Sequence, residues 1–279
     1  MGTDFNFDIN NNLIGSVTYS RQTGFKTMDF HSHSILEIYV FAEGAVTYYI
    51  EESAYSLVPG DILVIPPEQM HRPVISCEDV NYERCIINIS TDTLEKISTK
   101  DCNFTDVFSK KHLIRFSAEK QKSIFLQLFD ASNMLKSGKP EKNMYVNAKI
   151  LGFLTELLRA VKDGPEAMPP IKINSAVPDV IVYINSHLNE KINLDTLAAR
   201  FFISKYHLLR EFKKYTNFSI YDYIISKRIT LSKKLIAGGT LLHDTAVLSG
   251  FADYSTFYKS FIKKTGISPK EYKNSIEKK

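Results

Sequence analysis

The sequence predicts a multidomain protein: an N-terminal β-barrel, a following helical hairpin, and an all-α domain with two helix-turn-helix motifs joined by a long helix. Three observations predict this organisation. Short runs rich in β-branched and aromatic residues fill the first 115 positions, two amphipathic helical patterns follow them, and one helical unit occurs twice in the last third. A chain of 279 residues is long enough for about two domains, each with its own core.

Residues 1–115 are expected to form the β-barrel. Gly44, Gly60 and Pro66 stand in turn signals that separate the apolar runs. Many short strands at close spacing favour a barrel or a sandwich. The expected strands lie at residues 17–20, 36–41, 45–50, 55–58, 61–65 and 82–89.

Residues 116–162 are expected to form a helical hairpin. The apolar positions of residues 117–136, such as Ile124 and Leu128, repeat at helical spacing, and so do those of residues 141–162. Pro140 breaks the pattern between the two helices. We expect this hairpin to pack either on its own barrel or on a second copy across a two-fold axis, which would make a homodimer.

Residues 163–176 contain several prolines, which favour an extended linker over a continuous helix. Residues 177–279 then form the all-α domain. It is expected to have a helix at residues 178–188 and a connecting helix at 221–237 that ends at Gly238. We expect residues 274–279 to fray.

The repeated unit covers residues 194–212 and 242–261. Arg210 and Lys259 occupy matching places 49 positions apart (259 − 210), whereas Ala198 and Ala246 lie 48 apart (246 − 198). The second turn is therefore one residue longer. In the first copy Ser204 stands where the second helix needs an N-cap. A small residue, a tight turn and a capped second helix predict a helix-turn-helix.

The second helix of each copy is expected to bury an apolar face and to expose a face suited to DNA. Arginine can bond guanine edges in the major groove, and tyrosine or serine can reach phosphates. A connecting helix of roughly 25 Å could set the two helices about one DNA turn apart. An ordinary helical bundle with a solvated basic face is the alternative. The outward residues are Tyr206, Leu209, Arg210, Lys213, Tyr254, Ser255, Tyr258 and Lys259.

Charge divides the chain unevenly. Residues 1–171 hold 17 Lys+Arg and 22 Asp+Glu, a net of −5, and residues 172–279 hold 18 and 9, a net of +9. A basic half joined to an acidic half suggests that one part meets a polyanion and the other does not. Solvated surface charge is the alternative.

The composition excludes several classes of protein. No uncharged apolar run approaches the ~20 residues of a membrane helix, and the N-terminus lacks the features of a secretory signal. Cys77, Cys85 and Cys102 lack paired or metal-site spacing, which suits a reducing compartment. We therefore expect a cytoplasmic protein without a membrane partner.

Residues 178–273 resemble the DNA-binding domain of the AraC/XylS family of bacterial transcription regulators. Residues 250–272 match the family pattern G-F-x-D-x-S-x-F-x-R-x-F-x-K-x-x-G-x-S-P-x-x-Y nearly throughout, with Lys259 in place of arginine. In the first copy Asn217 replaces a glycine, and in the second Thr245 stands where Ile or Val is usual. The resemblance implies that Lys205 joins the eight residues above on the DNA-facing surfaces. Leu209 replaces a commonly polar position, which suits a thymine methyl.

A histidine cluster stands out in the barrel region. His31, His33, Glu37 and Gly44, followed by His71, resemble the two motifs of the cupin barrel, H-x-H-x-x-x-E-x-x-x-x-x-x-G and G-x-x-x-x-x-P-x-x-x-x-H. On this resemblance the three histidines and the glutamate occupy the positions that hold a metal in cupin enzymes. Such a donor set would suit Zn, Fe, Mn or Ni.

Three interpretations of His31, His33, Glu37 and His71 compete: a metal-dependent active site, a pocket for a small polar ligand, and buried groups satisfied by backbone partners. The regulator family resembles barrels that bind effectors, often sugars and mostly without metal. We therefore expect a ligand pocket without a cofactor, and a metal held by the same four residues is the less favoured alternative. Strand alternation places Glu37 and Tyr39 on one face, so Tyr39 joins the predicted ligand-binding residues.

The resulting hypothesis is a sequence-specific DNA-binding transcriptional regulator, not an enzyme, that responds to a small-molecule effector. A sugar effector and activation of transcription are expected from the resemblance alone. Its expected partners are double-stranded promoter DNA, the effector, RNA polymerase and a second copy of the chain. One alternative is a metal-dependent cupin enzyme fused to a DNA-targeting module. Another is a DNA-compacting protein with little preference among sequences.

Overall fold

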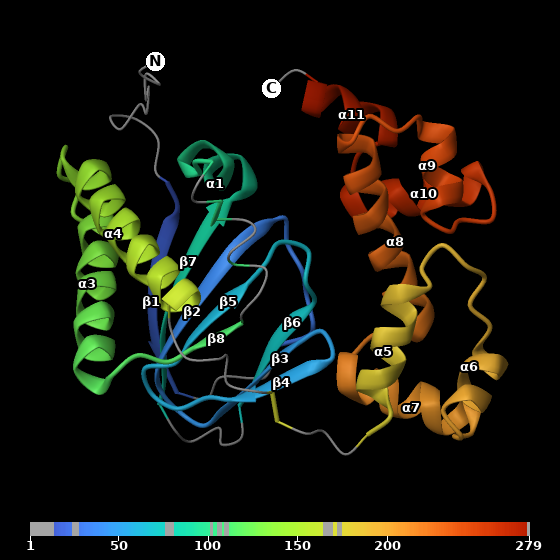
Figure 1. Cartoon of the computed structure of the whole chain (residues 1–279), viewed down its shortest axis with the longest axis horizontal. Coiled ribbons are helices and arrows are strands. Elements are labelled where there is room, and N and C mark those ends of the chain that lie inside the picture. Colours follow the sequence, from blue (N-terminus) through green and yellow to red (C-terminus); the bar gives the residue numbers. More distant parts are fainter. Residues whose placement is uncertain are drawn as a thin grey trace. The chain divides into compact units, whose positions relative to one another are not determined.

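The computed structural model describes residues 14–23, 28–75, 81–100, 103–104, 108, 112–163, 170–171 and 175–277. The chain divides into two compact units, Met1–Lys172 and Ile173–Lys279, and each is described by itself (Figure 1). Most of the predicted linker at 163–176 lies outside the described residues, as do Cys77 and Cys102.

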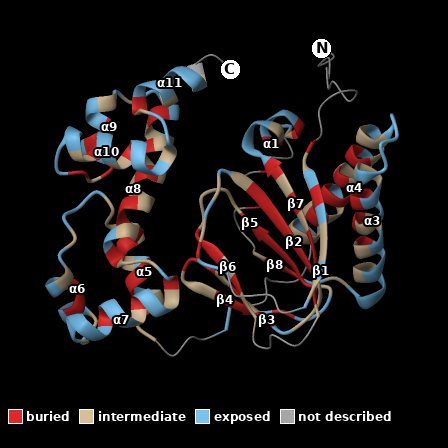
Figure 2. Cartoon of the chain, turned by 180° about the vertical axis from the view of Figure 1, so that it is seen from behind, coloured by how far each residue is buried: buried red, intermediate tan, exposed pale blue. Residues whose placement is uncertain are grey.

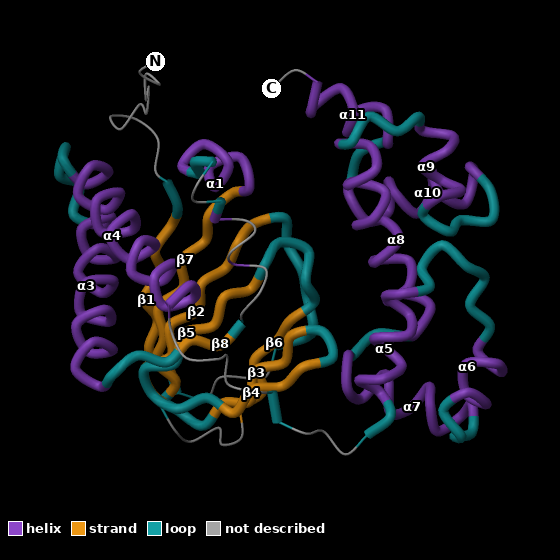
Figure 3. Tube along the Cα trace, in the orientation of Figure 1, coloured by secondary structure: helices purple, strands orange, loops and turns teal. Residues whose placement is uncertain are grey.

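The larger sheet of the N-terminal unit has five antiparallel strands in the order β1-β7-β2-β5-β8 (Figure 3). β2 pairs with β7 on one side and with β5 on the other. It is therefore a central strand, and from Leu36 to Phe41 every residue is buried. The strands are β1 (Ser16–Gln22), β2 (Ile35–Glu43), β5 (Ile62–Ile65), β7 (Tyr82–Ser90) and β8 (Leu113–Ile114).

A smaller sheet has three antiparallel strands in the order β4-β3-β6. They are β4 (Ser53–Ser56), β3 (Val46–Ile50) and β6 (His71–Ile75). An isolated bridge between His31 and His71 lies beside it. β6 was not among the expected strands, and it contains Pro73. The edge position of β6 explains why a proline is tolerated there.

The N-terminal unit differs from the expected closed barrel in two respects. Among the described residues, no strand of the larger sheet pairs with a strand of the smaller one, so closure is not shown. The region expected to be wholly β also contains helix α1 (Thr91–Ile97). Its start is set by Ser90, whose hydroxyl accepts the Thr93 amide at 3.1 Å, and Asp92 adds a favourable charge in the first turn.

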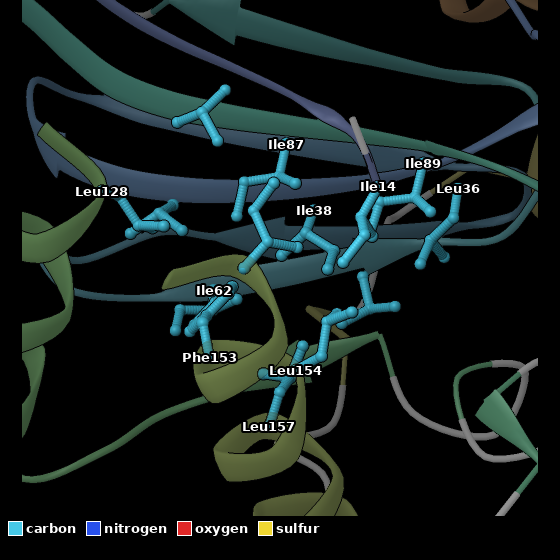
Figure 4. Close-up of a cluster of buried hydrophobic side chains, with 14 of the residues drawn as sticks. Ile14, Leu36, Ile38, Ile62, Ile87, Ile89, Leu128, Phe153, Leu154 and Leu157 are labelled. Carbon is cyan, nitrogen blue, oxygen red and sulfur yellow. The ribbon is translucent and has the colours of Figure 1, made fainter. Parts of the chain in front are cut away.

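The two faces of β2 bury different kinds of side chain. Leu36 and Ile38 belong to an apolar core that also receives residues from the following helices. Glu37 and Tyr39 lie on the opposite face, and Tyr39 packs with residues of the smaller sheet. Figure 4 shows the apolar side of this arrangement, with Leu36, Ile38, Ile62, Ile87, Phe153, Leu154 and Leu157.

The helical hairpin consists of α3 (Ala118–Lys136) and α4 (Lys142–Asp163) and packs against the larger sheet. This is the first of the two expected arrangements. Figure 2 shows buried residues along one side of each helix and exposed residues along the other. Leu128 and Leu154 are 1% and 0% exposed. Truncating either to alanine would destabilise this unit by about 2–5 kcal/mol.

The C-terminal unit is wholly helical in its described residues, and none of the described helices of the chain is long and apolar enough to cross a bilayer. α11 continues to Glu277, so residues 274–277 are helical and the expectation that they fray is wrong. Ser268 and Glu271 start the helix with reciprocal side-chain bonds of 3.2 and 2.7 Å. The helices are α5 (Val177–Ser186), α6 (Leu194–Arg200), α7 (Lys205–Thr216), α8 (Ile220–Ala237), α9 (Leu242–Leu248), α10 (Tyr254–Thr265) and α11 (Pro269–Glu277).

The repeated sequence forms two similar helix pairs, α6–α7 and α9–α10, on either side of α8. Each pair has a helix of 7 residues, a turn and a helix of 12 residues. The longer helices end at Asn217 and Gly266, both in the left-handed region with φ of 61° and 79°. Asparagine therefore serves where the family pattern has glycine, because it tolerates this conformation.

Candidate functional sites

The predicted histidine cluster forms in the N-terminal unit. Two backbone hydrogen bonds join His31 to His71, with N···O distances of 3.1 and 2.9 Å. They bring the first residue of β6 beside the segment that precedes β2. The ring centroids of His31 and His33 lie 4.4 and 4.9 Å from that of His71. Glu37 is four residues beyond His33, and its carboxylate reaches the His33 Nε2 at 3.1 Å. The structure thus brings all four residues together.

Each of the three imidazoles is fixed in its orientation by a backbone hydrogen bond. The Nδ1 atoms of His31, His33 and His71 each lie 2.8–3.1 Å from a backbone carbonyl two positions away in the chain. A carbonyl can only accept, so each Nδ1 carries a proton and donates it. The His33 Nε2 bonds the Glu37 carboxylate, so the Nε2 atoms of His31 and His71 are the ones that these bonds leave for a ligand. Donor atoms of the three histidines lie within 4.8 Å of one another.

Glu37 is the charged centre of the cluster. It is 7% exposed and accepts hydrogen bonds from His33 and from the Tyr48 hydroxyl, both at 3.1 Å. Burial alone would raise the pKa of Glu37, but the bond from His33 and the nearby His71 hold it well below its usual range. Burial would likewise lower the pKa of His33, but its bond to Glu37 raises it. Burial lowers the pKa of His31.

His71 is the cluster member with unmet bonding capacity. Its ring is 0% exposed, and its Nε2 lies 3.8 Å from the Glu37 carboxylate, beyond a hydrogen bond. Within the described part of the chain, no group bonds this nitrogen. A buried polar atom without a partner is uncommon, so this nitrogen is the one in the cluster best placed to bind a ligand or an ion.

The residues fit a divalent transition metal ion. Three imidazole nitrogens and a carboxylate form a donor set typical of Zn, Fe, Mn or Ni sites. Metal-bound histidines usually donate their second ring N–H to a carbonyl or carboxylate, which is the arrangement of His31, His33 and His71. The unpartnered Nε2 of His71 supports the same conclusion.

Tyr39 lies deeper than the predicted ligand-binding cluster. It is 1% exposed, its hydroxyl bonds that of Tyr82 at 2.6 Å, and its ring centroid is 4.8 Å from that of Tyr48. Tyr48 in turn donates to Glu37. Burial raises the pKa of all three tyrosines, so they stay protonated donors at neutral pH. The sequence did not single out Tyr82, because its partner comes from another strand of the sheet.

The second candidate site is the outward face of α7 and α10. All nine predicted residues are exposed: Lys205, Tyr206, Leu209, Arg210, Lys213, Tyr254, Ser255, Tyr258 and Lys259. The opposite faces are 0% exposed at Leu208, Phe212, Phe257 and Phe261. The apolar side chains that fix each helix are therefore separate from those it presents outward.

Caps position both helices. The Ser204 hydroxyl accepts the His207 amide at 3.2 Å, and the Asp253 carboxylate accepts the Thr256 amide at 2.7 Å. The bond from that amide is the main reason why the pKa of Asp253 is lowered. Lys205 donates to Asp195 of the preceding helix at 3.0 Å. Each cap satisfies a free N–H and fixes where its helix begins.

Arg228 links the loop after α5 to the second helix pair and was not predicted. From the middle of α8, its Nε donates to the Leu188 carbonyl at 2.9 Å and its Nη2 to the Glu190 carbonyl at 2.6 Å. Its guanidinium also lies 5.9 Å from the centroid of the Phe251 ring. The side chain thus ties the loop after α5 to the turn of the second pair. Its partners are backbone carbonyls, which leave no signal in sequence.

Comparison with known proteins gives two family matches. Residues 14–107 match the family described as AraC-like ligand binding domain, and residues 197–275 match that described as Helix-turn-helix domain. The uncharacterized HTH-type transcriptional regulator YbfI of Bacillus subtilis is 28% identical over 232 residues, 81% of this chain and 79% of that protein.

Two further proteins are similar. The bifunctional transcriptional activator/DNA repair enzyme AdaA of Bacillus subtilis is 33% identical over 107 residues, which are 36% of this chain and 51% of that protein. The crystal structure of ToxT from Vibrio cholerae, bound to an unsaturated fatty acid, is 16% identical, with a TM-score of 0.41 over 95% of this chain and 96% of that one.

Proposed function

The chain belongs to the AraC family of transcriptional regulators, and from this premise we propose that it binds specific promoter sequences through α7 and α10. The observation that carries the proposal is that each of these two helices has one buried face and one exposed face. α7 is anchored by Leu208 and Phe212 and α10 by Phe257 and Phe261, all with 0% exposure, and each helix presents a polar and aromatic face outward. Both pairs act as helix-turn-helix motifs, and α8, with 18 residues or about 27 Å of helix, separates them along one duplex.

Substitutions on these faces test the DNA proposal. Arg210→Ala should weaken binding of the full chain to a selected site by about 1–3 kcal/mol and relax preference at one base position. Lys259→Ala should weaken binding to all sequences alike. It should also reduce the slope of the logarithm of the binding constant against the logarithm of the salt concentration by about 1. Exposed Lys191, in the loop after α5, provides a control at which alanine should change little.

Binding would be measured by fluorescence anisotropy at two salt concentrations. Unchanged affinity and preference in both the Arg210 and Lys259 variants would exclude the proposed faces.

The effector is proposed to bind at His31, His33, Glu37 and His71, with Tyr48 and Tyr39 behind them. Fixed imidazole nitrogens, a carboxylate and tyrosine hydroxyls suit a small polyhydroxylated molecule, and a sugar is the first candidate. No catalytic step is assigned to these residues, and the relatives described as transcriptional regulators support a non-enzymatic role.

A transition metal ion is a second candidate for the same site. The observation in its favour is that all three Nδ1 atoms are tied to carbonyls while the Nε2 of His71 has no hydrogen-bond partner among the described residues. His31, His33, His71 and Glu37 would hold the ion, which would supply a Lewis-acidic contact for an oxygen ligand. The backbone carbonyls of Asp29, Ile35 and Gln69 would keep the imidazoles oriented.

One experiment separates the two candidates. Thermal unfolding of the full chain, purified without a His-tag, would be followed with sugars, with metabolites and with Zn, Mn, Fe or Ni salts. A metal site predicts stoichiometric metal in the purified protein and its loss in a His31→Ala/His33→Ala variant. A metal-independent pocket predicts stabilisation by an organic ligand in the presence of chelator. No shift with any compound would count against both.

The remaining parts of the proposal concern assembly. The outer side of the hairpin exposes Leu126 and Met144 at 54% and 57%, which favours a homodimer contact. Sedimentation showing only monomer at micromolar concentration would contradict it. We further propose activation, through contact with RNA polymerase, in the bacterial cytoplasm where the promoter DNA is. A reporter fused to the target promoter would distinguish activation from repression.

A further inference from the structure

Arg210, on the outward face of α7, is held along one edge by two neighbours on the same helix. Its Nε donates to Oε1 of Glu211 at 3.2 Å. Its Nη2 donates to Nδ1 of His207 at 3.1 Å, because a guanidinium has only donors and the imidazole nitrogen must accept. The Arg210 side chain is 59% exposed and that of Glu211 29%. A surface cation is therefore held by a partly covered carboxylate.

Helix stability does not explain this arrangement. Consecutive residues on a helix do not normally face each other, and an ion pair at such exposure adds little to stability. A carboxylate beside DNA also repels phosphates, so Glu211 lowers the non-specific affinity of the very helix that is proposed to bind DNA. Neither stability nor non-specific affinity therefore explains why Glu211 lies next to Arg210.

The atoms involved suggest what is gained. Nε–H and one Nη2–H lie on the side edge of the guanidinium, and Glu211 and His207 occupy that edge. The end edge, formed by Nη1–H and the second Nη2–H, is not used by these bonds. Two parallel N–H groups on this edge match the O6 and N7 acceptors of guanine in the major groove.

We propose that Glu211 and His207 are positioning residues that hold Arg210 with its end edge toward a guanine. The inference rests on the proposed DNA-binding function and adds to it the source of base discrimination. Because the guanidinium is already restricted in the free protein, the side chain loses less conformational entropy when it binds a base. It also keeps Arg210 from turning to a phosphate, where it would carry no sequence information.

The second helix pair lacks this arrangement and provides an internal comparison. At the constant offset of 49, the places of His207, Arg210 and Glu211 are taken by Thr256, Lys259 and Ser260. Thr256 bonds the cap residue Asp253 at 2.9 Å instead. A lysine ammonium is a flexible point charge without bidentate geometry. Lys259 should therefore contribute mainly affinity, while Arg210 contributes the preference for one base pair.

The test compares variants of the full chain on a selected DNA site and on its single-base substitutions. Glu211→Ala should reduce discrimination at the position read by Arg210 by about tenfold and should raise binding to random DNA. Glu211→Gln keeps an acceptor and should restore part of the discrimination. In an Arg210→Ala background, Glu211→Ala should have no further effect on discrimination. A purely structural role would not produce this position-specific pattern.

Thermal unfolding of each variant controls for loss of fold, and Lys259→Ala provides the matched variant on the other helix. Glu211→Ala that leaves discrimination at every position unchanged, or weakens all sites equally, would overturn the inference. So would an effect of equal size in the Arg210→Ala background. If instead the wild-type chain prefers no site at all, the proposed function itself fails, so the two failures are distinguishable.

Discussion

Asp61 illustrates, for a single residue, how a buried charge is tolerated in the N-terminal unit. It is 0% exposed, and its Oδ2 accepts hydrogen bonds from Nη2 of Arg115 at 2.7 Å and from the Val58 amide at 2.9 Å. Arg115 lies just before α3, so the pair links the strand region to the start of the helical hairpin. Because the carboxylate cannot reach water, its stability depends on these partners.

Removing the cation should therefore destabilise the unit strongly. Arg115→Ala leaves the Asp61 carboxylate buried with only the amide donor, and we expect a loss of about 3 kcal/mol in the free energy of unfolding. Exposed Arg159 on α4 is the matched control, where alanine should change stability by less than about 0.5 kcal/mol. Urea unfolding followed by circular dichroism would measure both. Similar values for the two variants would show that the pair is not needed.

Single residues also show which parts of the site can be predicted from sequence. His31, His33, Glu37 and His71 were predicted to lie together from their resemblance to the two cupin motifs, and a backbone bridge between His31 and His71 joins the two segments that carry them. The role of Tyr82 was not predictable, since it depends on which side chain faces it across the sheet. Nor was the bond of Arg210 to His207 predictable, because it depends on rotamers rather than on spacing.

At the scale of elements, two glycines of the second helix pair differ in what they pack against. Gly250 and Gly266 have nearly the same left-handed backbone, with φ of 85° and 79°. A Cβ at Gly250 would lie 2.0 Å from the Leu188 carbonyl oxygen, whereas one at Gly266 would meet no described atom within 4 Å. Only the first glycine is required by close packing as well as by conformation.

This difference predicts two distinct alanine effects. Gly266→Ala should cost about 1–2 kcal/mol, the strain of a left-handed residue alone. Gly250→Ala adds a steric conflict with the loop that Arg228 holds, and should cost about 3 kcal/mol or more. Thermal unfolding of the helical unit would compare them. A Gly250 variant as stable as the Gly266 variant would contradict the packing described for this turn.

Helices were more predictable than strands for a physical reason. The α6–α7 and α9–α10 pairs follow from local spacing, caps and a repeat, all of which sequence displays directly. β6 was missed because Pro73 is acceptable only at a sheet edge, and edge position is a property of the assembled sheet. Likewise, α1 begins at a Ser90 cap within a region whose composition otherwise favours strands. Closure of the strands into a barrel also depends on pairing that composition does not specify.

For the whole molecule, the central issue is how the two units share one function. The basic excess lies in residues 172–279 and the acidic excess in residues 1–171, in accord with the proposal that the first of these binds DNA and the second an effector. An effector can change DNA binding only if it binds one arrangement of the units more tightly than another. A tenfold effect on DNA affinity requires about 1.4 kcal/mol of such preference.

Selection of DNA from a random library by the full chain tests the central claim most directly. We predict an enriched site with two short conserved blocks whose centres lie about 10 base pairs apart, one for each helix pair on the same face of the duplex. Substitution of either block should weaken binding, and the block read by α7 should contain a guanine that Arg210→Ala no longer distinguishes. Recovery of unenriched DNA, bound equally well at all sequences, would contradict the account and favour a DNA-compacting protein.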